Sequence, residues 1–485
     1  MDLRQYVESI KPTGEFELVN GADWNLEIGA ITDMNARRRG PCLLFDDIKG
    51  YPRGYRVLTC MLGGPRRLSF ALGLGRLENH NQIVSALEGK PTEWELKAAS
   101  FPPRFVSTSE LMENKFTSEE NNIDFLKFPT PLWHDGDGGR YIGTGGTVIT
   151  RDPEDGKINL GTYRVMIQGK DVVGVHIEKF HHGSIHMRKY HKEGKPCPVV
   201  LSFGHDPIIF IASSLPMPYE IPELGYAGAI RGAPIDVIEG PVTGLPIPAS
   251  SEIAVEGYIH PDDLMEEGPF GEFTGYFGGE RALRTVVRPK AVYHRNDPII
   301  LGSLTSKPPH DYSYFRTIVQ SASVKDRLRR AGVPGVTGVW YHESGCLYFW
   351  AVVAIKQQYA GHARQAGHVA ALCGEVGGWG RYIIVVDDDI DPTNLEDVIW
   401  ALSTRSDPAT STDFIQKTST GSLDPLVRKP AEVFYTSRAV IVACKPYEWM
   451  DKFPKVVQVS NELKAQVKAK WPKLFQTESS IARGD

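Results

Sequence analysis

The stretch between about residues 140 and 305 constrains the fold most, because short β-branched runs recur in it between glycines and prolines. Short runs of this kind, bounded by turn residues, are typical of the strands of a β-barrel or sandwich. We expect strands at Thr147–Thr150, Val172–Ile177, Val199–Phe203, Ile208–Ile211, Ile235–Glu239, Ile253–Ile259 and Thr285–Val292.

The chain has a different pattern on either side of this region. Before it, we expect a short helix at Asp2–Ser9, a strand-like run at Arg56–Leu62 and a helix near Asn79–Leu87. After it, a long helix at Ser313–Ala331 ends at Gly332 and Pro334. Strands then alternate with helices, which indicates an α/β domain. Its expected elements are Leu347–Lys356, Gly361–Cys373, Arg381–Val386 and Leu395–Leu402.

The C-terminal stretch Asn461–Phe475 is amphipathic, with Leu463, Val467 and Trp471 at helical spacing. An apolar stripe of this kind is buried against another element. We expect this helix to close a core of its own chain, and docking on a partner chain is the alternative.

Composition limits the class of protein. With 485 residues the chain exceeds the roughly 250–300 residues at which one core stops growing, so two or three domains are expected. The net charge of −5 is spread without a strong block, which argues against a nucleic-acid or anionic-membrane partner. There is no apolar run of about 18 residues, no export signal at the start and no CxxC among six cysteines. We therefore expect reduced thiols and a cytoplasmic location.

The segment Glu267–Glu272, with the sequence EGPFGE, sets two carboxylates around a rigid proline and two glycines. The earlier segment Asn159–Arg164 adds an amide and an arginine. A buried glutamate can carry a proton at neutral pH, while an arginine holds a neighbouring glutamate ionised. Such a set can bind an acid and hand it a proton. The alternative is a turn flanked by solvated acids.

Five histidines lie within sixteen positions, which indicates a metal site or a set of structural side chains. They are His176, His181, His182, His186 and His191. None forms the HExxH pattern of zinc proteases. If one of them joins Asn159 and a glutamate, the mixed ligand set suits Mg or Mn better than zinc.

Three further motifs leave two interpretations each. The glycine-rich stretch Asp135–Gly146 is either a phosphate nest or, as we expect, a loop that leads into a strand. Asp387–Asp389 could bind a cation or form a solvated strand end, which we favour. Ser213 and Ser214 could face a monovalent cation or a phosphate, but they lack the GxSxG context of a serine hydrolase.

Together these segments resemble the UbiD family of decarboxylases, which use prenylated FMN. The similarity runs through most of the chain and is densest from about 140 to 410. Six motifs carry it in the family's order: Asn159–Arg164, Ser213–Pro218, Val255–Tyr258, Glu267–Glu272, Lys356–His362, and Val398–Ala401 with Thr404 and Arg405.

The resemblance implies an α/β (α+β) protein of three domains. These are an N-terminal α/β domain over 1–115, a split β-barrel that binds prenylated FMN over 116–310, and a C-terminal α/β oligomerisation domain over 336–485. A linker helix over 311–335 joins the last two. It also implies a homodimer or larger homo-oligomer, and a flavin prenyltransferase as supplier of the cofactor.

The family's ligand positions fall on residues of this chain. Asn159, His181 and Glu223 match the ligands of a divalent cation, usually Mn(II) or else Mg, although the adjacent His182 leaves the histidine open. A K+ ion sits close by in the family. The positions of its region and of the phosphate match Ala212, Ser213, Leu215, Glu223 and Arg405. Further cofactor contacts fall on Gly161, Thr162, Tyr163, Arg164 and Ser214.

The catalytic set of the family matches Arg164, Glu267 and Glu272. By this resemblance, Glu272 donates the proton that replaces CO2, Arg164 lies near the substrate carboxylate, and Glu267 orients Arg164. The implied activity is the reversible, non-oxidative decarboxylation of an aromatic, heteroaromatic or α,β-unsaturated acid.

The substrate itself is open. His310 and Arg316 are polar candidates for a hydroxylated, nitrogen-containing or second-carboxylate ring, or they belong to a helix start with Asp311 as its cap. Two other functions are alternatives: a flavin oxidoreductase on a split barrel, and a non-catalytic flavin-binding partner subunit.

Overall fold

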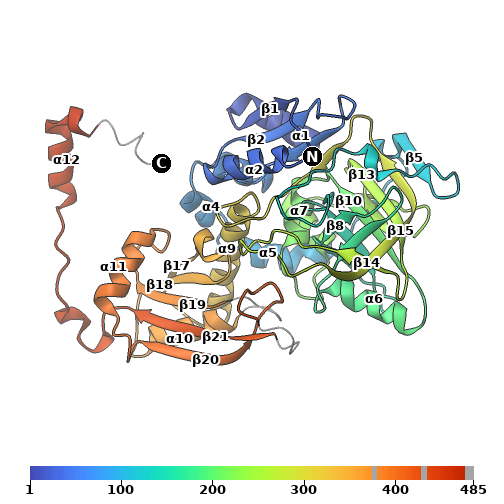
Figure 1. Ribbon diagram of the computed structural model, residues 1–485. Helices are drawn as coiled ribbons and strands as arrows, with labels where there is room; N and C mark the ends of the chain where they lie inside the picture. Colours follow the sequence, from blue (N-terminus) through green and yellow to red (C-terminus); the bar gives the residue numbers. More distant parts are fainter. Residues whose placement is uncertain (374–379, 428–433, 476–485) are drawn as a thin grey trace.

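The structure is a computed structural model that describes residues 1–373, 380–427 and 434–475. Its described strands form four sheets, of four, nine, three and five strands. The N-terminal part, the barrel-like part and the C-terminal part follow one another in the colours of Figure 1, and the long helix α9 (Ser313–Arg330) lies between the last two. No helix in these ranges is long and apolar enough to cross a membrane.

The N-terminal part is a four-stranded sheet with helices on both faces. Its strand order is β1 (Phe16–Asn20), β2 (Cys42–Asp46), β3 (Arg56–Thr59) and β16 (Ile299–Leu301), so its last strand returns from beyond the barrel. Leu43 and Phe45 pack on one face, and Cys42 and Leu44 pack on the other. Burial on both faces explains why β2 is an apolar run without alternation. The helices around it are α1 (Leu3–Ile10), α2 (Glu27–Arg37), α3 (Pro65–Ala71), α4 (His80–Ala86) and α5 (Lys90–Lys97).

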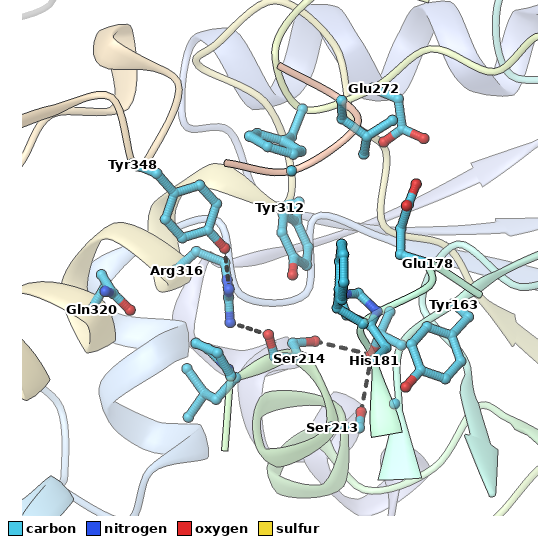
Figure 2. Close-up of a pocket in the computed structure, with 18 of the residues that line it drawn as sticks. Tyr163, Glu178, His181, Ser213, Ser214, Glu272, Tyr312, Arg316, Gln320 and Tyr348 are labelled. Carbon is cyan, nitrogen blue, oxygen red and sulfur yellow. Dashed lines mark hydrogen bonds between the residues drawn. The ribbon is translucent and has the colours of Figure 1, made fainter. Parts of the chain in front are cut away.

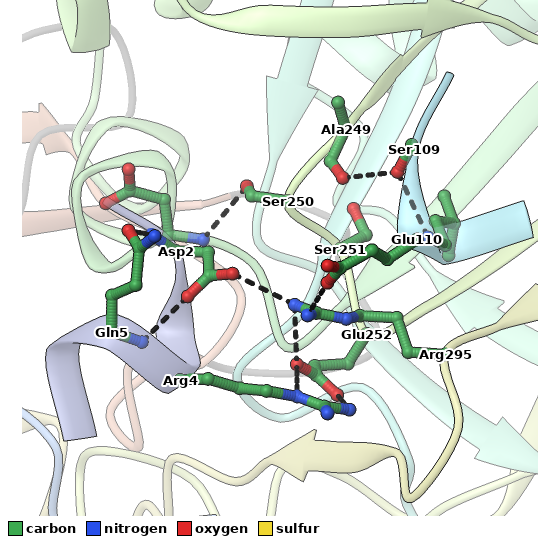
Figure 3. Close-up of polar contacts among 12 residues, drawn as sticks. Asp2, Arg4, Gln5, Ser109, Glu110, Ala249, Ser250, Ser251, Glu252 and Arg295 are labelled. Carbon is green, nitrogen blue, oxygen red and sulfur yellow. Dashed lines mark hydrogen bonds and ion pairs between the residues drawn. The ribbon is translucent and has the colours of Figure 1, made fainter. Parts of the chain in front are cut away.

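Ion pairs attach the first helix to the barrel-like part (Figure 3). The Arg4 guanidinium donates two hydrogen bonds to the fully buried Glu252, at 2.8 and 2.7 Å. Arg295 joins Asp2 at 3.0 Å and Glu252 at 3.3 Å. A buried carboxylate is stable when cations surround it, so these contacts fix the start of the chain against the barrel.

The central part is a curled nine-stranded sheet. Its main path runs β7–β6–β10–β13–β15–β9–β8, and β14 and β5 also pair with the 13-residue β15. Only Thr162 and Tyr163 separate the end of β7 from the start of β8, yet these strands lie at opposite ends of the path. The sheet must therefore curl until its two edges meet, which forms a split barrel. The bounds are Asn114–Thr117 (β5), Thr147–Arg151 (β6), Ile158–Gly161 (β7), Arg164–Ile167 (β8), Val173–His176 (β9), Cys197–Phe203 (β10), Ile253–Ile259 (β13), Leu264–Glu267 (β14) and Ala282–His294 (β15).

One expected strand of this region is wrong. Residues Ile208–Ile211 belong to helix α7 (Pro207–Ser214), whose eight residues are all buried. The side chain of Asp206 caps the helix by accepting the N–H of Ile208, and Pro207 takes the first helical position. Two more helices flank the barrel, α6 (His182–Lys192) and α8 (Glu223–Arg231). A small sheet contains β4 (Arg104–Phe105), β11 (Asp236–Glu239) and β12 (Pro246–Pro248).

The C-terminal part is a five-stranded sheet with helices on both faces. Its order is β17 (Val336–Tyr341), β18 (Trp350–Ile355), β19 (Tyr382–Asp387), β21 (Tyr435–Ala443) and β20 (Thr412–Ser419). Helices α9 and α10 (His362–Leu372) pack on one face. Helix α11 (Leu395–Arg405) packs on the other. The expected alternation of strands and helices is confirmed.

The expectation that the C-terminal helix closes a core of its own chain is wrong. Helix α12 (Asn461–Lys470) has no buried residue, and it lies apart from the rest of the protein in Figure 1. Leu463 and Trp471 are each about half exposed. The helix lies beyond the stretch 453–460, which is in neither helix nor strand. We call residues 446–475 the C-terminal arm.

Candidate active site

A cavity of about 380 Å³ lies where the two edges of the split barrel meet the C-terminal part. Both sides of it carry polar and aromatic groups, shown in Figure 2. The barrel side contributes the β7–β8 connection, the start of α6 and the end of α7. The opposite side contributes the first turns of α9 and loops of the C-terminal sheet, among them Tyr312, Arg316, Tyr348, Ser422 and Leu423.

Arg164, Glu267 and Glu272 meet at this cavity. Arg164 is the first residue of β8, Glu267 is the last residue of β14, and Glu272 follows in the loop. The guanidinium binds Glu267 with Nε at 2.8 Å and Nη2 at 2.7 Å. It reaches Glu272 with Nη1 at 2.5 Å. Tyr141 also donates its hydroxyl hydrogen to Glu267, at 2.8 Å. The fold thus brings Arg164 to two glutamates that lie 103 and 108 positions later in the sequence.

The two carboxyl groups have opposite electrostatic environments. Burial raises the pKa of Glu267, but the hydrogen bonds and charge of Arg164 outweigh burial, so the net pKa is lowered. Burial raises the pKa of Glu272 as well, and there Arg164 only partly compensates while nearby carboxylates add to the rise. The arrangement can hold one glutamate ionised and the other protonated.

Asn159, His181 and Glu223 line one wall of the cavity. Asn159 lies on β7, His181 precedes α6 with its ring 5.4 Å from that of Tyr163, and Glu223 begins α8. Burial raises the pKa of Glu223 to about 8, and its carboxylate accepts the N–H of Leu160 at 3.3 Å. Ionised at this depth, Glu223 needs a cation nearby.

Two observations bear on whether this wall can hold a metal ion. No group of three His, Cys, Asp or Glu side chains in residues 1–373, 380–427 and 434–475 is arranged to hold a metal. The buried amide nitrogen of Asn159 lacks a hydrogen-bond partner within the same ranges. His182 also lines the cavity, and its ring lies 5.1 Å from that of Tyr219. The Asn159 amide, a histidine ring and the buried Glu223 carboxylate are suitable ligands for a divalent ion. Either His181 or His182 could supply the ring.

The other expected cofactor contacts lie at the end of α7 and in the β7–β8 connection. Thr162 Oγ1 lies 3.0 Å from Ser213 Oγ and 3.1 Å from Ser214 Oγ. The cavity wall also includes Gly161, Tyr163 and Leu215. Ala212 is buried within α7, behind this wall. The hydroxyls and the helix end give the wall several groups that can face a polar ligand.

The structure does not bring Arg405 to the cavity. Arg405 ends α11 on the outer face of the C-terminal sheet. There its guanidinium binds Asp387 at 3.0 Å and Asp389 at 2.7 and 2.9 Å. Lys445 is a further partner of Asp389, at 2.7 Å. The expected place of Arg405 beside K+ is therefore corrected. In the acidic stretch Asp387–Asp389, the charges of Asp387 and Asp389 are thus paired with those of Arg405 and Lys445.

His310 and Arg316 have different surroundings. His310 is buried outside the cavity, and burial lowers its pKa to about 3. Arg316 lines the cavity and donates hydrogen bonds to the Ser214 carbonyl and the Tyr348 hydroxyl. Asp311 does not cap α9, because its carboxylate accepts the N–H of Cys60 at 2.9 Å. Of the two substrate candidates, only Arg316 faces the site.

Several cavity residues carried no signal in a sequence motif. The Glu178 carboxylate lies 2.9 Å from His176 Nε2, and it also accepts a hydrogen bond from Ser422 of the C-terminal part. Burial raises the pKa of Glu178, but His176 and its other contacts lower it to about 2. Tyr348 and Ser422 reach the site only because the C-terminal sheet packs against the barrel. Their positions depend on tertiary structure, so spacing alone could not find them.

Three stretches of the chain match domain models of one family. These are the N-terminal, Rift-related and C-terminal domains of 3-octaprenyl-4-hydroxybenzoate carboxy-lyase, at residues 9–87, 104–308 and 313–443. Between them they span most of the chain. The chain belongs to the UbiD family.

Solved structures agree with this membership. The UbiD-class enzyme HmfF from Pelotomaculum thermopropionicum, in complex with FMN, is 27% identical with a TM-score of 0.82, over 96% of this chain and 98% of that chain. An evolved dimeric form of HmfF in complex with prFMN is 26% identical, with a TM-score of 0.79 and the same coverage. The vanillic acid decarboxylase of Sedimentibacter hydroxybenzoicus in closed form is 26% identical with a TM-score of 0.81, over 98% and 99%. This UbiD-family chain is thus a carboxy-lyase with a curled half-barrel at its centre.

Proposed function

We propose that this carboxy-lyase removes CO2 reversibly and without oxidation from an aromatic, heteroaromatic or α,β-unsaturated acid, with Glu272 as the proton donor. The observation that carries this proposal is one guanidinium shared by two buried glutamates with opposite pKa shifts at a cavity wall. A hydride transfer needs no such donor, which disfavours a flavin oxidoreductase. A non-catalytic partner subunit needs no such trio either.

Prenylated FMN is the cofactor that fits this site. The relative HmfF is known in complex with FMN and, in an evolved form, with prFMN. When bound, prenylated FMN supplies an electrophilic ring that accepts electrons from the breaking carbon–carbon bond. The wall formed by Gly161, Thr162, Tyr163, Ser213 and Ser214 would hold it, and a flavin prenyltransferase would supply it.

Asn159, His181 and Glu223 would hold a divalent cation, Mn(II) or Mg, next to the cofactor phosphate. Burial raises the pKa of the Glu223 carboxyl, and only backbone hydrogen bonds oppose this rise, so a metal ion would supply the positive charge that the ionised form needs. The carbonyl and hydroxyl oxygens of Ser213 and the carbonyl of Leu215 would face a K+ ion close by.

The residues of the chain have separate tasks in the reaction. Arg164 orients the substrate carboxylate, and Glu267 keeps Arg164 in place through two hydrogen bonds. As CO2 leaves, the proton of Glu272 moves to the substrate carbon that had carried the carboxylate group, and Glu272 becomes a carboxylate. The charge of Arg164 then stabilises the newly formed Glu272 anion.

We propose that Arg316 recognises the substrate ring. Its guanidinium lies between the rings of Tyr312 and Tyr348, at 5.6 and 5.4 Å. A planar fork of donors at a cavity wall suits a carboxylate or a hydroxyl on the ring. We therefore propose a substrate with a polar ring substituent.

We also propose that the chain forms a homodimer or larger oligomer through its C-terminal domain, over residues 336–485. The C-terminal arm exposes Val457, Leu463 and Trp471. On the same domain α11 exposes Leu395, Ile399 and Trp400. Two exposed apolar surfaces on one domain can cover each other between two copies of the chain.

The test is production of the protein with and without a flavin prenyltransferase, followed by absorption spectra and CO2 release from a panel of aromatic acids. We expect a flavin spectrum that changes with the prenyltransferase, and CO2 release only from the co-produced protein. CO2 release that is equal in both preparations, or absent from both across the panel, contradicts the proposal.

A further inference from the structure

The loop that carries Glu272 rests on a second loop, residues 134–141, which the proposed chemistry does not use. The Gly138 N–H donates to the carbonyl of Pro269 at 2.7 Å. A Cβ atom on Gly138 would lie 1.8 Å from the Gly268 carbonyl oxygen, so only glycine allows this approach. Gly138 therefore allows the two loops to pack closely.

Asp137 makes the most specific contact between the two loops. Its side chain is fully buried, and Oδ1 accepts the backbone N–H of Gly271 at 3.0 Å. The other oxygen accepts the His134 N–H at 3.0 Å and lies 3.0 Å from the Nδ1 of the same residue. Both oxygens are used, so the carboxylate has one defined orientation.

The backbone around Gly271 is fixed on both sides. Thr305 donates its hydroxyl hydrogen to the Gly271 carbonyl at 2.7 Å, while Asp137 holds the Gly271 N–H. The next residue, Glu272, donates its N–H to the Tyr276 carbonyl at 3.0 Å. Three hydrogen bonds thus fix the peptide groups from which the Glu272 side chain extends toward Arg164.

We propose that Asp137 is a positioning residue of the decarboxylase, which sets Glu272 through the Gly271 peptide. Tyr141, at the end of the same loop, holds Glu267 by its hydroxyl at 2.8 Å. One loop therefore orients both carboxylates of the site. This inference rests on Glu272 being the proton donor proposed above. A displacement of about 1 Å in a reacting group can cost on the order of 10²-fold in rate.

The test compares Asp137→Ala with Asp135→Ala, because Asp135 is an exposed residue of the same loop. In Asp137→Ala we expect kcat per bound flavin to fall by roughly 10- to 100-fold, with KM and flavin content unchanged. The solvent isotope effect on kcat should rise, because proton delivery becomes slower. This effect is a ratio, so it does not depend on the fraction of folded enzyme. Asp135→Ala should match the wild type in every measure.

Asp137→Asn is the second variant, and it replaces Asp137→Ala in the test if that protein fails to fold. Its single side-chain oxygen can accept from Gly271 or from His134 but not from both, so we expect a smaller fall in kcat than in Asp137→Ala. An unchanged isotope effect together with a kcat per flavin within twofold of the wild type overturns the proposal. Glu272→Gln is measured in parallel. If it keeps full activity, the donor role and the positioning role fall together; if only Asp137 variants are normal, the positioning role alone falls.

Discussion

Arg164 contacts Glu272 through one guanidinium nitrogen, Nη1 at 2.5 Å, while the rest of the fork is occupied by Glu267. The single contact leaves the pKa of Glu272 raised, because burial outweighs the attraction of Arg164. A protonated acid beside a fixed cation can lose its proton and then remain as a stabilised anion.

Replacement of Glu272 by Gln keeps the shape and removes the proton. We expect decarboxylation to fall by ~10²-fold or more, as for loss of a general acid, while flavin is retained. The matched control is Glu266→Gln, because Glu266 lies on the same strand with a largely exposed side chain. Near-normal turnover in Glu272→Gln contradicts the donor role.

The rate should also depend on pH through the same group. Since Glu272 must be protonated to act and its pKa lies above the ordinary value, the rate is full at low pH and declines as pH rises through that pKa. The pH profile of kcat checks this expectation. A rate that rises with pH over the same range would assign the proton donation to another group.

The stability of the metal-free protein should depend on Glu223. Its pKa is about 8 in the folded chain against an ordinary 4.5, so the folded state holds a proton that the unfolded state loses between those values. Stability therefore falls as pH rises from about 5 to 8. Added Mn(II) should offset the loss at pH 8. Melting temperatures of the wild type and Glu223→Gln across this pH range, with and without Mn(II), test both expectations. An equal Mn(II) effect in both proteins would place the metal elsewhere.

His181→Ala and His182→Ala distinguish the two candidate histidine ligands. We expect His181→Ala to lose the divalent ion and the flavin together, because His181 lies beside Tyr163 on the Asn159 wall. His182→Ala should keep both, since its ring lies against Tyr219. Elemental analysis and the visible spectrum measure the outcome, and loss of metal in the His182 variant alone would reverse the assignment.

Arg316→Ala should change substrate preference and not only rate. A ring hydroxyl or carboxylate can accept an N–H of Arg316, whereas an apolar ring cannot, so an apolar acid should bind less well beside Arg316. We expect the ratio of kcat/KM between a polar-substituted ring acid and a cinnamate-like acid to fall in Arg316→Ala. Arg330→Ala, at the exposed end of the same helix, is the control. An unchanged ratio removes Arg316 from substrate recognition.

Removal of the C-terminal arm, from residue 446 on, should lower the oligomeric state measured by analytical ultracentrifugation. A milder change is Trp471→Asp on its apolar side, with Lys464→Asp as the charged control. We expect dissociation in the first variant and none in the control. If the shortened chain keeps the assembly of the full chain, the arm is not the contact between copies.

The sequence predicted most strands and helices but failed where burial hides periodicity. Residues 207–214 are buried all round, so four β-branched or aromatic residues resembled a strand. The signal that was overlooked is Asp206 followed by Pro207, a helix start. The prediction for Arg405 was wrong for another reason: Asp387, the last residue of β19, and Asp389, just beyond it, hold its guanidinium away from the cavity. Glu178 and Tyr348 carry no local pattern at all, and only packing brings them to the site.

The cavity wall comes from two parts of the chain with separate cores. The barrel carries Arg164, Glu267 and Glu272, whereas Tyr348, Ser422 and Leu423 belong to loops of the C-terminal sheet. With the roles proposed above, the residues of proton transfer and those of the opposite cavity wall lie in different stretches of sequence. Laboratory evolution toward new acids can therefore vary residues 341–348 and 420–423 while the proton-transfer trio is left intact.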